Sequence, residues 1–235
     1  MKPQSGKMMV SLLLLMGASI AAQTPNADSQ VWPSVTAAFD LRPKTRLQLY
    51  EELRAGDSYR QWTTGVMLNY RIRRRLDLHR PNNNDEEEHT LVIGGGYENV
   101  RTTQNGKTKN ESRIVVQGTP RFTPGAGFLI TDRNRIEFRW NDGTYNFRYR
   151  NMLIIDHPLK AGAFHFTPYA SGELFYDRNH HSWNENQYAF GAQLPYKKIL
   201  MLDTYYLHQN CTTCNPNPIN AFGVTLNLYL RTIKK

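Results

Sequence analysis

Residues 132–177 constrain the fold most strongly, because apolar and charged residues alternate there in three successive segments. The segments are residues 135–140 (RIEFRW), 147–153 (FRYRNML) and 166–177 (FTPYASGELFYD). Successive side chains of a β-strand point to opposite faces, so each segment predicts a strand with one apolar face and one polar face. The apolar faces must meet either a protein core or lipid, and the rest of the sequence has to decide between these environments.

The first 22 residues have the parts of a secretory signal peptide. Lys2 and Lys7 form a basic start, residues 8–16 (MMVSLLLLM) form an apolar stretch, and a small-residue segment with cleavage motifs follows. The apolar stretch is too short to span a bilayer as a helix, which takes about 20 residues. We therefore predict a cleaved signal peptide at 1–22, export, and a single domain at 23–235.

The charge of the chain indicates its surroundings. The net charge is +9, from 29 Lys and Arg against 20 Asp and Glu, and excess positive charge favours anionic partners. Nucleic acid is not expected behind a signal peptide, so the lipid and lipopolysaccharide of a bacterial outer membrane are the expected partners, although solubility alone also accounts for the charge. After the signal peptide no apolar run reaches 18 residues, so no membrane-spanning helix is predicted.

Strand-length alternation continues along the whole mature chain, bounded by Gly, Pro, Asn and Asp. Asn105-Gly106 and Asp142-Gly143 are strong hairpin signals between such segments. Tyr and Trp recur near segment ends, as in the aromatic girdle of a membrane barrel: Trp32, Trp62, Tyr97, Trp140, Tyr176, Trp183 and Tyr206. Eleven strand candidates result, at about residues 35–41, 46–53, 62–72, 89–100, 111–122, 135–140, 147–153, 166–177, 184–194, 199–208 and 222–231.

These candidates predict a closed sheet. Many are about as long as a tilted strand that crosses a membrane, and an open sheet of this width would expose unpaired edges. We therefore predict an all-β fold: a single antiparallel up-and-down transmembrane β-barrel of 10 to 12 strands. Bacterial single-chain barrels have even strand numbers, which slightly favours twelve, with ten if residues 35–41 lie outside. The long break at residues 73–88 falls at the end where turns should be short, so the topology of the first third stays open.

Ten charged residues on the predicted inward faces are the candidate functional residues. Buried charges must pair, because an unpaired one costs several kcal/mol, on the order of 3–5. Such a set can form a salt-bridge network that plugs the barrel, a constriction that selects small ions or anionic solutes, or a catalytic group. The ten are Arg133, Arg135, Glu137, Arg139, Arg148, Arg150, Glu173, Asp177, Glu185 and Asp203. We expect Glu137 and Glu173 to pair with four of the arginines: Arg135, Arg139, Arg148 and Arg150.

Cys211 and Cys214 stand in the segment NCTTCNPNP. In an exported protein such a pair most simply forms a disulfide. A redox-active CxxC normally opens a helix, which Pro216 and Pro218 oppose. A zinc site would need two further ligands, of which only His208 is near in sequence. Free thiols and a metal remain open alternatives, but no metal or cofactor is expected.

No catalytic motif is recognised in the sequence. His180, His181 and Ser182 lie in a predicted loop, and Ser171 and Glu173 share an inward face, but no motif joins them into a triad. The glycine-rich GGGYEN lacks the lysine and the helix of a phosphate-binding loop. We therefore do not expect an enzyme.

Several segments together resemble the DUF2490 family. They are DRNRIEFRW, YNFRYRN, FTPYASGELFYD, WNENQYAFG and DTYYLHQ, in that order, and the resemblance is strongest over residues 133–209. The family consists of exported bacterial proteins of unknown function that are regarded as outer-membrane β-barrels. The resemblance implies this fold and location, and it brings no catalytic residues to this chain.

The expected function is that of an outer-membrane barrel, either structural or a narrow, restricted channel with a charge-networked lumen. Its partners would be membrane lipid, lipopolysaccharide and, during biogenesis, the barrel-assembly machinery. One alternative is an outer-membrane enzyme that acts on lipid or lipopolysaccharide at the external rim. Another is a soluble periplasmic β-protein that binds a ligand.

Overall fold

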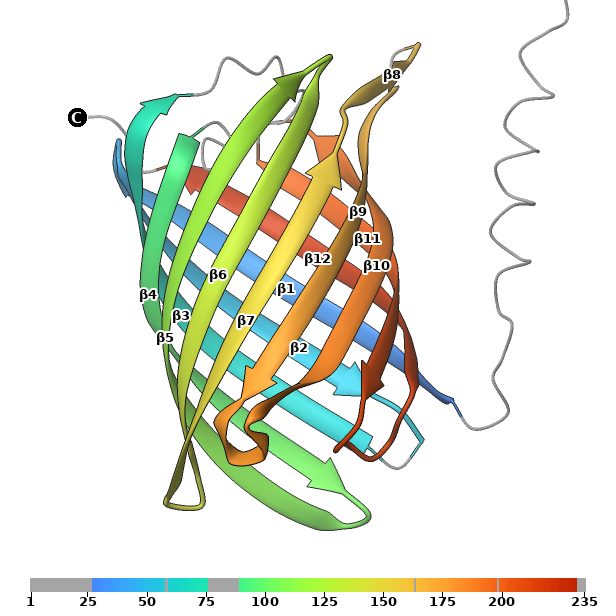
Figure 1. The fold of residues 1–235 in the computed structure, drawn as a ribbon. Helices are drawn as coiled ribbons and strands as arrows, with labels where there is room; N and C mark the ends of the chain where they lie inside the picture. The colour runs from blue at the N-terminus through green and yellow to red at the C-terminus, as the bar shows by residue number, and fades with distance from the viewer. Residues whose placement is uncertain (1–26, 58, 76–88, 163, 198, 232–235) are drawn as a thin grey trace, which may run out of the picture.

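The computed structural model describes residues 27–57, 59–75, 89–162, 164–197 and 199–231 (Figure 1). The signal peptide predicted at residues 1–22 lies outside these residues. Apart from one 3-10 turn, η1 (Arg178–His180), the described elements are strands, and none of them is a helix long and apolar enough to span a membrane. The strands are β1 (Asp28–Arg42), β2 (Thr45–Ala55), β3 (Tyr59–Arg75), β4 (His89–Gln104), β5 (Lys107–Gly125), β6 (Phe128–Asn141), β7 (Thr144–Asp156), β8 (Leu159–Ala161), β9 (Phe164–Asp177), β10 (Ser182–Tyr196), β11 (Leu200–Cys211) and β12 (Ile219–Arg231).

The strands close into a barrel, which confirms the predicted fold class. Within the described residues, eleven strands form the wall, and the short β8 pairs only with the start of β9. Each of the eleven strand candidates falls in one wall strand, including the weak one at 35–41, which is part of β1. The count lies inside the predicted range of 10 to 12 but is not the favoured twelve.

The seam of the barrel corrects a second detail, because β1 and β12 run parallel, from Asp28 beside Ile219 to Asp40 beside Arg231. The barrel is therefore mixed rather than purely antiparallel. The reason is geometric: when successive strands alternate in direction, an odd number of them makes the first and the last run the same way. The even-strand rule was the wrong guide here.

The hairpin turns are where the sequence predicts them. Asn105 and Gly106 join β4 to β5 with φ values of 50° and 76°, and Asp142 and Gly143 join β6 to β7 with 47° and 85°. Positive φ at both central residues is the requirement of a type I′ hairpin turn, which Asn-Gly and Asp-Gly satisfy. These two turns, η1 and the loop between β11 and β12 lie at one end of the barrel (Figure 1).

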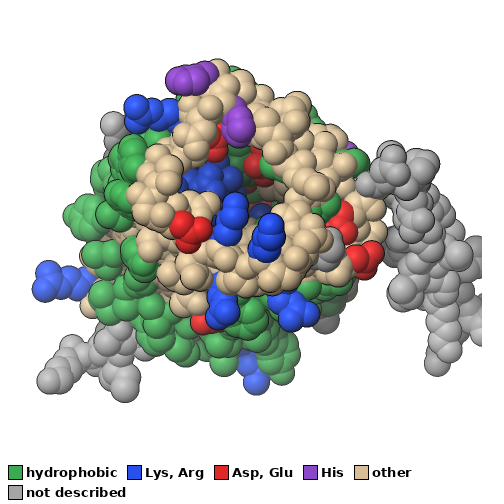
Figure 2. All heavy atoms as spheres, turned by 90° about the horizontal axis from the view of Figure 1, so that it is seen from below, with side chains coloured by type: hydrophobic (Ala, Val, Ile, Leu, Met, Phe, Trp, Pro, Cys, Tyr) green, Lys and Arg blue, Asp and Glu red, His purple; other side chains and the backbone are tan. Residues whose placement is uncertain are grey.

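The two faces of the wall have opposite chemistry. On β3, Leu68 and Tyr70 are exposed, whereas Asn69 and Arg71, which alternate with them, are buried. The same alternation runs around the barrel, so the outer wall is largely apolar, and the end view shows charged side chains inside the hollow (Figure 2). The protein thus buries polar groups and exposes apolar ones, the reverse of a soluble domain.

The aromatic residues expected near segment ends mostly face outward, with one exception. Trp62, Trp140 and Trp183 are exposed. Trp32 is wrong as a girdle residue, because it points into the barrel and is 2% exposed. Its indole Nε1 donates a 2.7 Å hydrogen bond to Gln30 Oε1, and Trp32 packs in an apolar cluster on the inner wall.

Three tyrosines inside the barrel lie over glycines of the neighbouring strand. Tyr50 stands opposite Gly65, and the other two pairs are Tyr169 with Gly191 and Tyr205 with Gly223. A Cβ on Gly65 would collide with the ring of Tyr50, so the missing side chain is what lets this ring lie flat on the wall. The glycines therefore set the shape of the inner surface.

Substitution of Gly65 by alanine should destabilise the barrel. The added methyl group would overpack against the Tyr50 ring, at a cost of about 1–3 kcal/mol in the free energy of unfolding. Gly118→Ala is the matched control, because a Cβ there meets no atom within 4 Å. Urea unfolding of both variants in detergent, followed by circular dichroism, measures the difference. Equal stabilities of the two variants would contradict this account of the Tyr50–Gly65 pair.

Candidate functional site: the charged interior

The centre of the interior is Glu137 on β6, a carboxylate with no solvent exposure. It accepts hydrogen bonds from Arg135 Nε at 2.9 Å, from Arg148 Nε at 2.8 Å and from Arg150 Nη1 at 3.0 Å. Arg135 and Arg150 stand opposite each other on β6 and β7, so register alone brings both to this carboxylate. Charge-assisted bonds of this kind are about twice as strong as neutral ones, and they hold the two strands in register.

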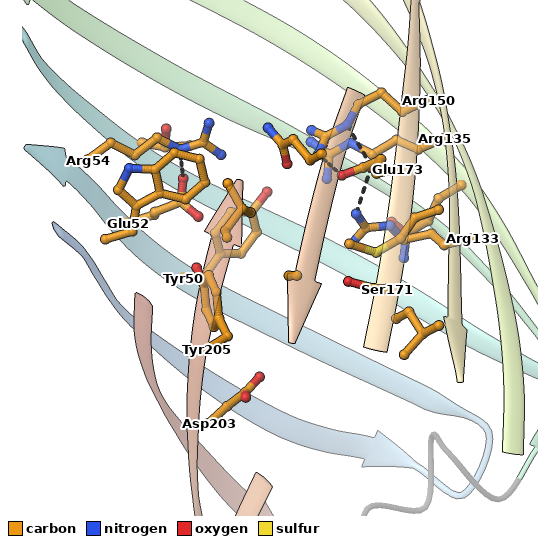
Figure 3. A pocket seen from close by; sticks show the side chains of 18 of the residues that line it. Tyr50, Glu52, Arg54, Arg133, Arg135, Arg150, Ser171, Glu173, Asp203 and Tyr205 are labelled. Carbon is orange, nitrogen blue, oxygen red and sulfur yellow. Dashed lines mark hydrogen bonds and ion pairs between the residues drawn. The ribbon is translucent and has the colours of Figure 1, made fainter. Parts of the chain in front are cut away.

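Two further carboxylates extend the cluster across four strands. Glu173 on β9 accepts two bonds from Arg150, at 2.9 and 2.8 Å, and one from Arg133 Nη2 at 3.0 Å. Glu98 on β4 accepts from Arg135 and from the Tyr50 hydroxyl. Arg135 therefore bridges Glu137 to Glu98, and Arg150 bridges Glu137 to Glu173. Figure 3 shows the contact between Arg150 and Glu173.

A second group of ion pairs lies nearer the end that carries the hairpin turns. Glu111 accepts two bonds from Arg139, at 2.7 and 2.8 Å, and one from Arg113 Nε. Arg139 also lies 3.5 Å from Asp177 Oδ2. Arg113 lies 3.5 Å from Glu98, which joins this group to the central one.

Nine of the ten predicted residues belong to this connected network. Glu185 joins it through Arg148, which lies 3.8 Å away. Asp203, the tenth, accepts a 3.1 Å hydrogen bond from Tyr169. Of the expected pairs, Arg135, Arg148 and Arg150 meet Glu137. Arg139 does not: its partners are Glu111 and Asp177.

Sequence reasoning missed Glu98, Glu111 and Arg113, which lie on β4 and β5 and precede the ten predicted residues in the chain. The signal was present, because each occupies the inward parity of its strand. Near the other end, Asp40 pairs with Arg46 at 2.8 Å and with Arg71 at 3.1 Å, and these were missed for the same reason.

A central hollow and a smaller one lie within the described part of the barrel. The central one has a volume of about 420 Å³ and lies beside Arg133, Arg135 and Arg150, with Tyr50 and Tyr205 on the facing wall (Figure 3). A smaller one, of about 160 Å³, lies nearer the mouth. Four side chains line both hollows and therefore lie between them: Arg54, Gln61, Arg113 and Arg150.

The loop between β11 and β12 lies over the mouth. Cys211 and Cys214 form a disulfide within it, so neither thiol is free. Gln104 at the end of β4 donates a 2.5 Å hydrogen bond to the carbonyl of Asn215. Since β1, β2 and β3 separate β12 from β4 in the barrel order, this contact carries the loop across the opening. Cys214 and Asn215 form part of the wall of the smaller hollow.

The residues considered for catalysis do not come together. His180 and His181 are exposed at the η1 turn. Ser171 lines the central hollow. His208 faces outward from β11, with Nδ1 2.7 Å from Asn220 Oδ1, so the barrel wall separates it from Ser171.

Replacement of Glu137 by glutamine should strongly destabilise the barrel. The change leaves three buried arginines short of one negative charge, which costs about 3–5 kcal/mol when a buried ion pair is broken. Glu51→Gln is the control, because Glu51 lies on the outer face and accepts one 3.2 Å hydrogen bond from Thr64. The urea midpoint of each variant in detergent gives the comparison, and a Glu137 variant as stable as the Glu51 variant would refute the central role of this carboxylate.

No curated protein matches the chain. Among solved structures, LpxR from Salmonella typhimurium aligns with 7% sequence identity and a TM-score of 0.49, over 79% of this chain and 83% of that one. The model of a family described as "protein of unknown function (DUF2490)" matches residues 29–220. The chain therefore belongs to the DUF2490 family.

Proposed function

We propose that the protein is an integral outer-membrane β-barrel whose lumen is a narrow channel, held closed at rest by ion pairs. The observation that carries this proposal is the inverted burial of the wall, with Glu137 fully buried and residues such as Leu68 and Phe190 exposed. A closed barrel satisfies its backbone hydrogen bonds within the wall, which is what a lipid environment demands of a spanning structure. Lipid and lipopolysaccharide contact the outer wall, and the barrel-assembly machinery inserts it.

The lumen is restricted by side chains rather than by backbone. The four residues between the hollows are long and hold their positions through ion pairs and hydrogen bonds, Arg54 to Glu52 at 2.6 Å and Arg113 to Glu111 among them. Side chains can change rotamer without unfolding the wall, so the barrier can open for a small solute while the barrel persists. Charged side chains around such a constriction select solutes by charge as well as by size.

The location is tested by fractionation of cells that express the full chain. We expect the protein in the outer-membrane fraction, with faster gel mobility before boiling than after it, because the closed barrel resists detergent unfolding at room temperature. Recovery of the folded protein free in the periplasm would exclude the membrane barrel and favour a soluble ligand-binding protein.

The channel is tested in planar bilayers with Arg54→Ala. Arg54 lines both hollows, lies outside the Glu137 cluster, and stacks 4.0 Å from the Trp32 ring. Its removal should raise single-channel conductance several-fold above a small wild-type value. The control is Arg101→Ala, because Arg101 is exposed and lies on β4 near the Asn105-Gly106 turn. This variant should leave the conductance unchanged. Flat current records from both the wild type and the Arg54 variant would exclude the channel function and favour a structural role for the barrel.

A further inference from the structure

We propose that the central hollow is a binding site for a small organic oxyanion, a carboxylate or a phosphate, with Arg133 as its main contact. The inference rests on the proposed function, since it names the class of solute that the lumen would hold. At about 420 Å³ the hollow has the size of a small-molecule site, which spans roughly 300–1,000 Å³.

Arg133 is the network arginine that remains available. Its side chain is 28% exposed, compared with 11% for Arg150 and 10% for Arg135. It lines the hollow and its one ion pair joins Nη2 to Glu173. A guanidinium carries five N–H donors, and in the described part of the chain the Nε of Arg133 has no hydrogen-bond partner.

The carboxylate beside Arg133 is already occupied by another arginine. Glu173 receives a two-pronged contact from Arg150, at 2.9 and 2.8 Å, which uses both of its oxygens. The hollow is lined by five arginines and four carboxylates, and Glu137 and Glu111 are further partners of Arg135, Arg150 and Arg113. Arg133, by contrast, has Glu173 as its ion-pair partner and shares it with Arg150. The carboxylates each have a partner, in the pairs Glu52–Arg54, Glu98–Arg135, Glu173–Arg150 and Asp203–Tyr169.

Two hydroxyl groups add donors to the same space. Ser171 and Tyr205 line the hollow, and their hydroxyls take part in none of the side-chain hydrogen bonds described above. Figure 3 shows Ser171 on the same side of the hollow as Arg133, and Tyr205 on the facing wall. A planar arginine fork together with hydroxyl donors is the usual protein environment of a carboxylate or phosphate group.

Part of the wall that faces Arg133 is apolar, which favours an organic anion over a bare inorganic one. Trp32, Ala189 and Leu207 are buried in one cluster and line the same hollow. Tyr205 packs against this cluster. A ligand with an oxyanion head and a short apolar body would therefore place its head at Arg133 and its body on this wall.

The experiment is isothermal titration calorimetry of the detergent-purified barrel with benzoate and, separately, with inorganic phosphate. We expect saturable binding at one site, weakened about tenfold or more by Arg133→Gln, which corresponds to about 1.4 kcal/mol. Arg101→Gln removes the same charge from the outer face and should bind as the wild type does. Preference for benzoate identifies a carboxylate with an apolar body, whereas preference for phosphate identifies a phosphate group; either supports an oxyanion site.

The variant should fold, because Glu173 keeps both bonds from Arg150 when Arg133 is removed. If it does not fold, Ser171→Val and Tyr205→Phe replace it, and each should weaken binding about threefold or more. Absence of binding of both anions to the wild type, or equal affinities of the Arg133 and Arg101 variants, overturns the proposal. Binding without bilayer conductance would support the oxyanion site and exclude the channel function. Conductance without binding would support the channel function and exclude the oxyanion site.

Discussion

The barrel depends on the placement of charge in a space that solvent barely reaches. Glu137 is fully buried and has three arginine partners, and no single one of them could be lost without leaving unbalanced charge. Because side chains alternate with period two, a slip of one residue between β6 and β7 would turn Arg135 or Arg150 outward. The ion pairs therefore fix the register of the central strands, and the backbone ladders to either side of them follow from that register.

The inner wall is divided into two halves of different character. Most of the connected network around Glu137 lies on β4 to β7 and β9, whereas Trp32, Leu207 and Ile219 pack together on the strands around the parallel seam. Across that seam the hydroxyls of Ser34 and Thr225 lie 2.6 Å apart. Neither half fills the lumen completely, and the central hollow is the space left where the arginines of one half face the aromatic residues of the other.

Much of this arrangement could be predicted from alternation alone, since period two fixes both the strands and the faces of their side chains. Eleven alternating segments became eleven wall strands, and the error lay in preferring a general even-number rule to that direct count. Trp32 shows a different limit, because a residue type that suits an interface also suits a buried cluster. Arg139 shows a third: alternation places it inside, but its partner Glu111 depends on the register between β5 and β6, which no local pattern determines.

The position of the loop over the mouth depends on a contact that could not be predicted from the sequence. Gln104 and Asn215 are far apart in the chain and meet only because the barrel closes. The disulfide shortens the loop, and the hydrogen bond across the opening then holds Cys214 and Asn215 above the smaller hollow. If the proposed channel exists, a solute that entered at this end would pass this loop and then the side chains of Arg54, Arg113 and Arg150 before it reached Arg133. In the proposed channel, size would be restricted at the mouth and charge in the layer behind it, so Arg133 would hold only a solute that had passed both.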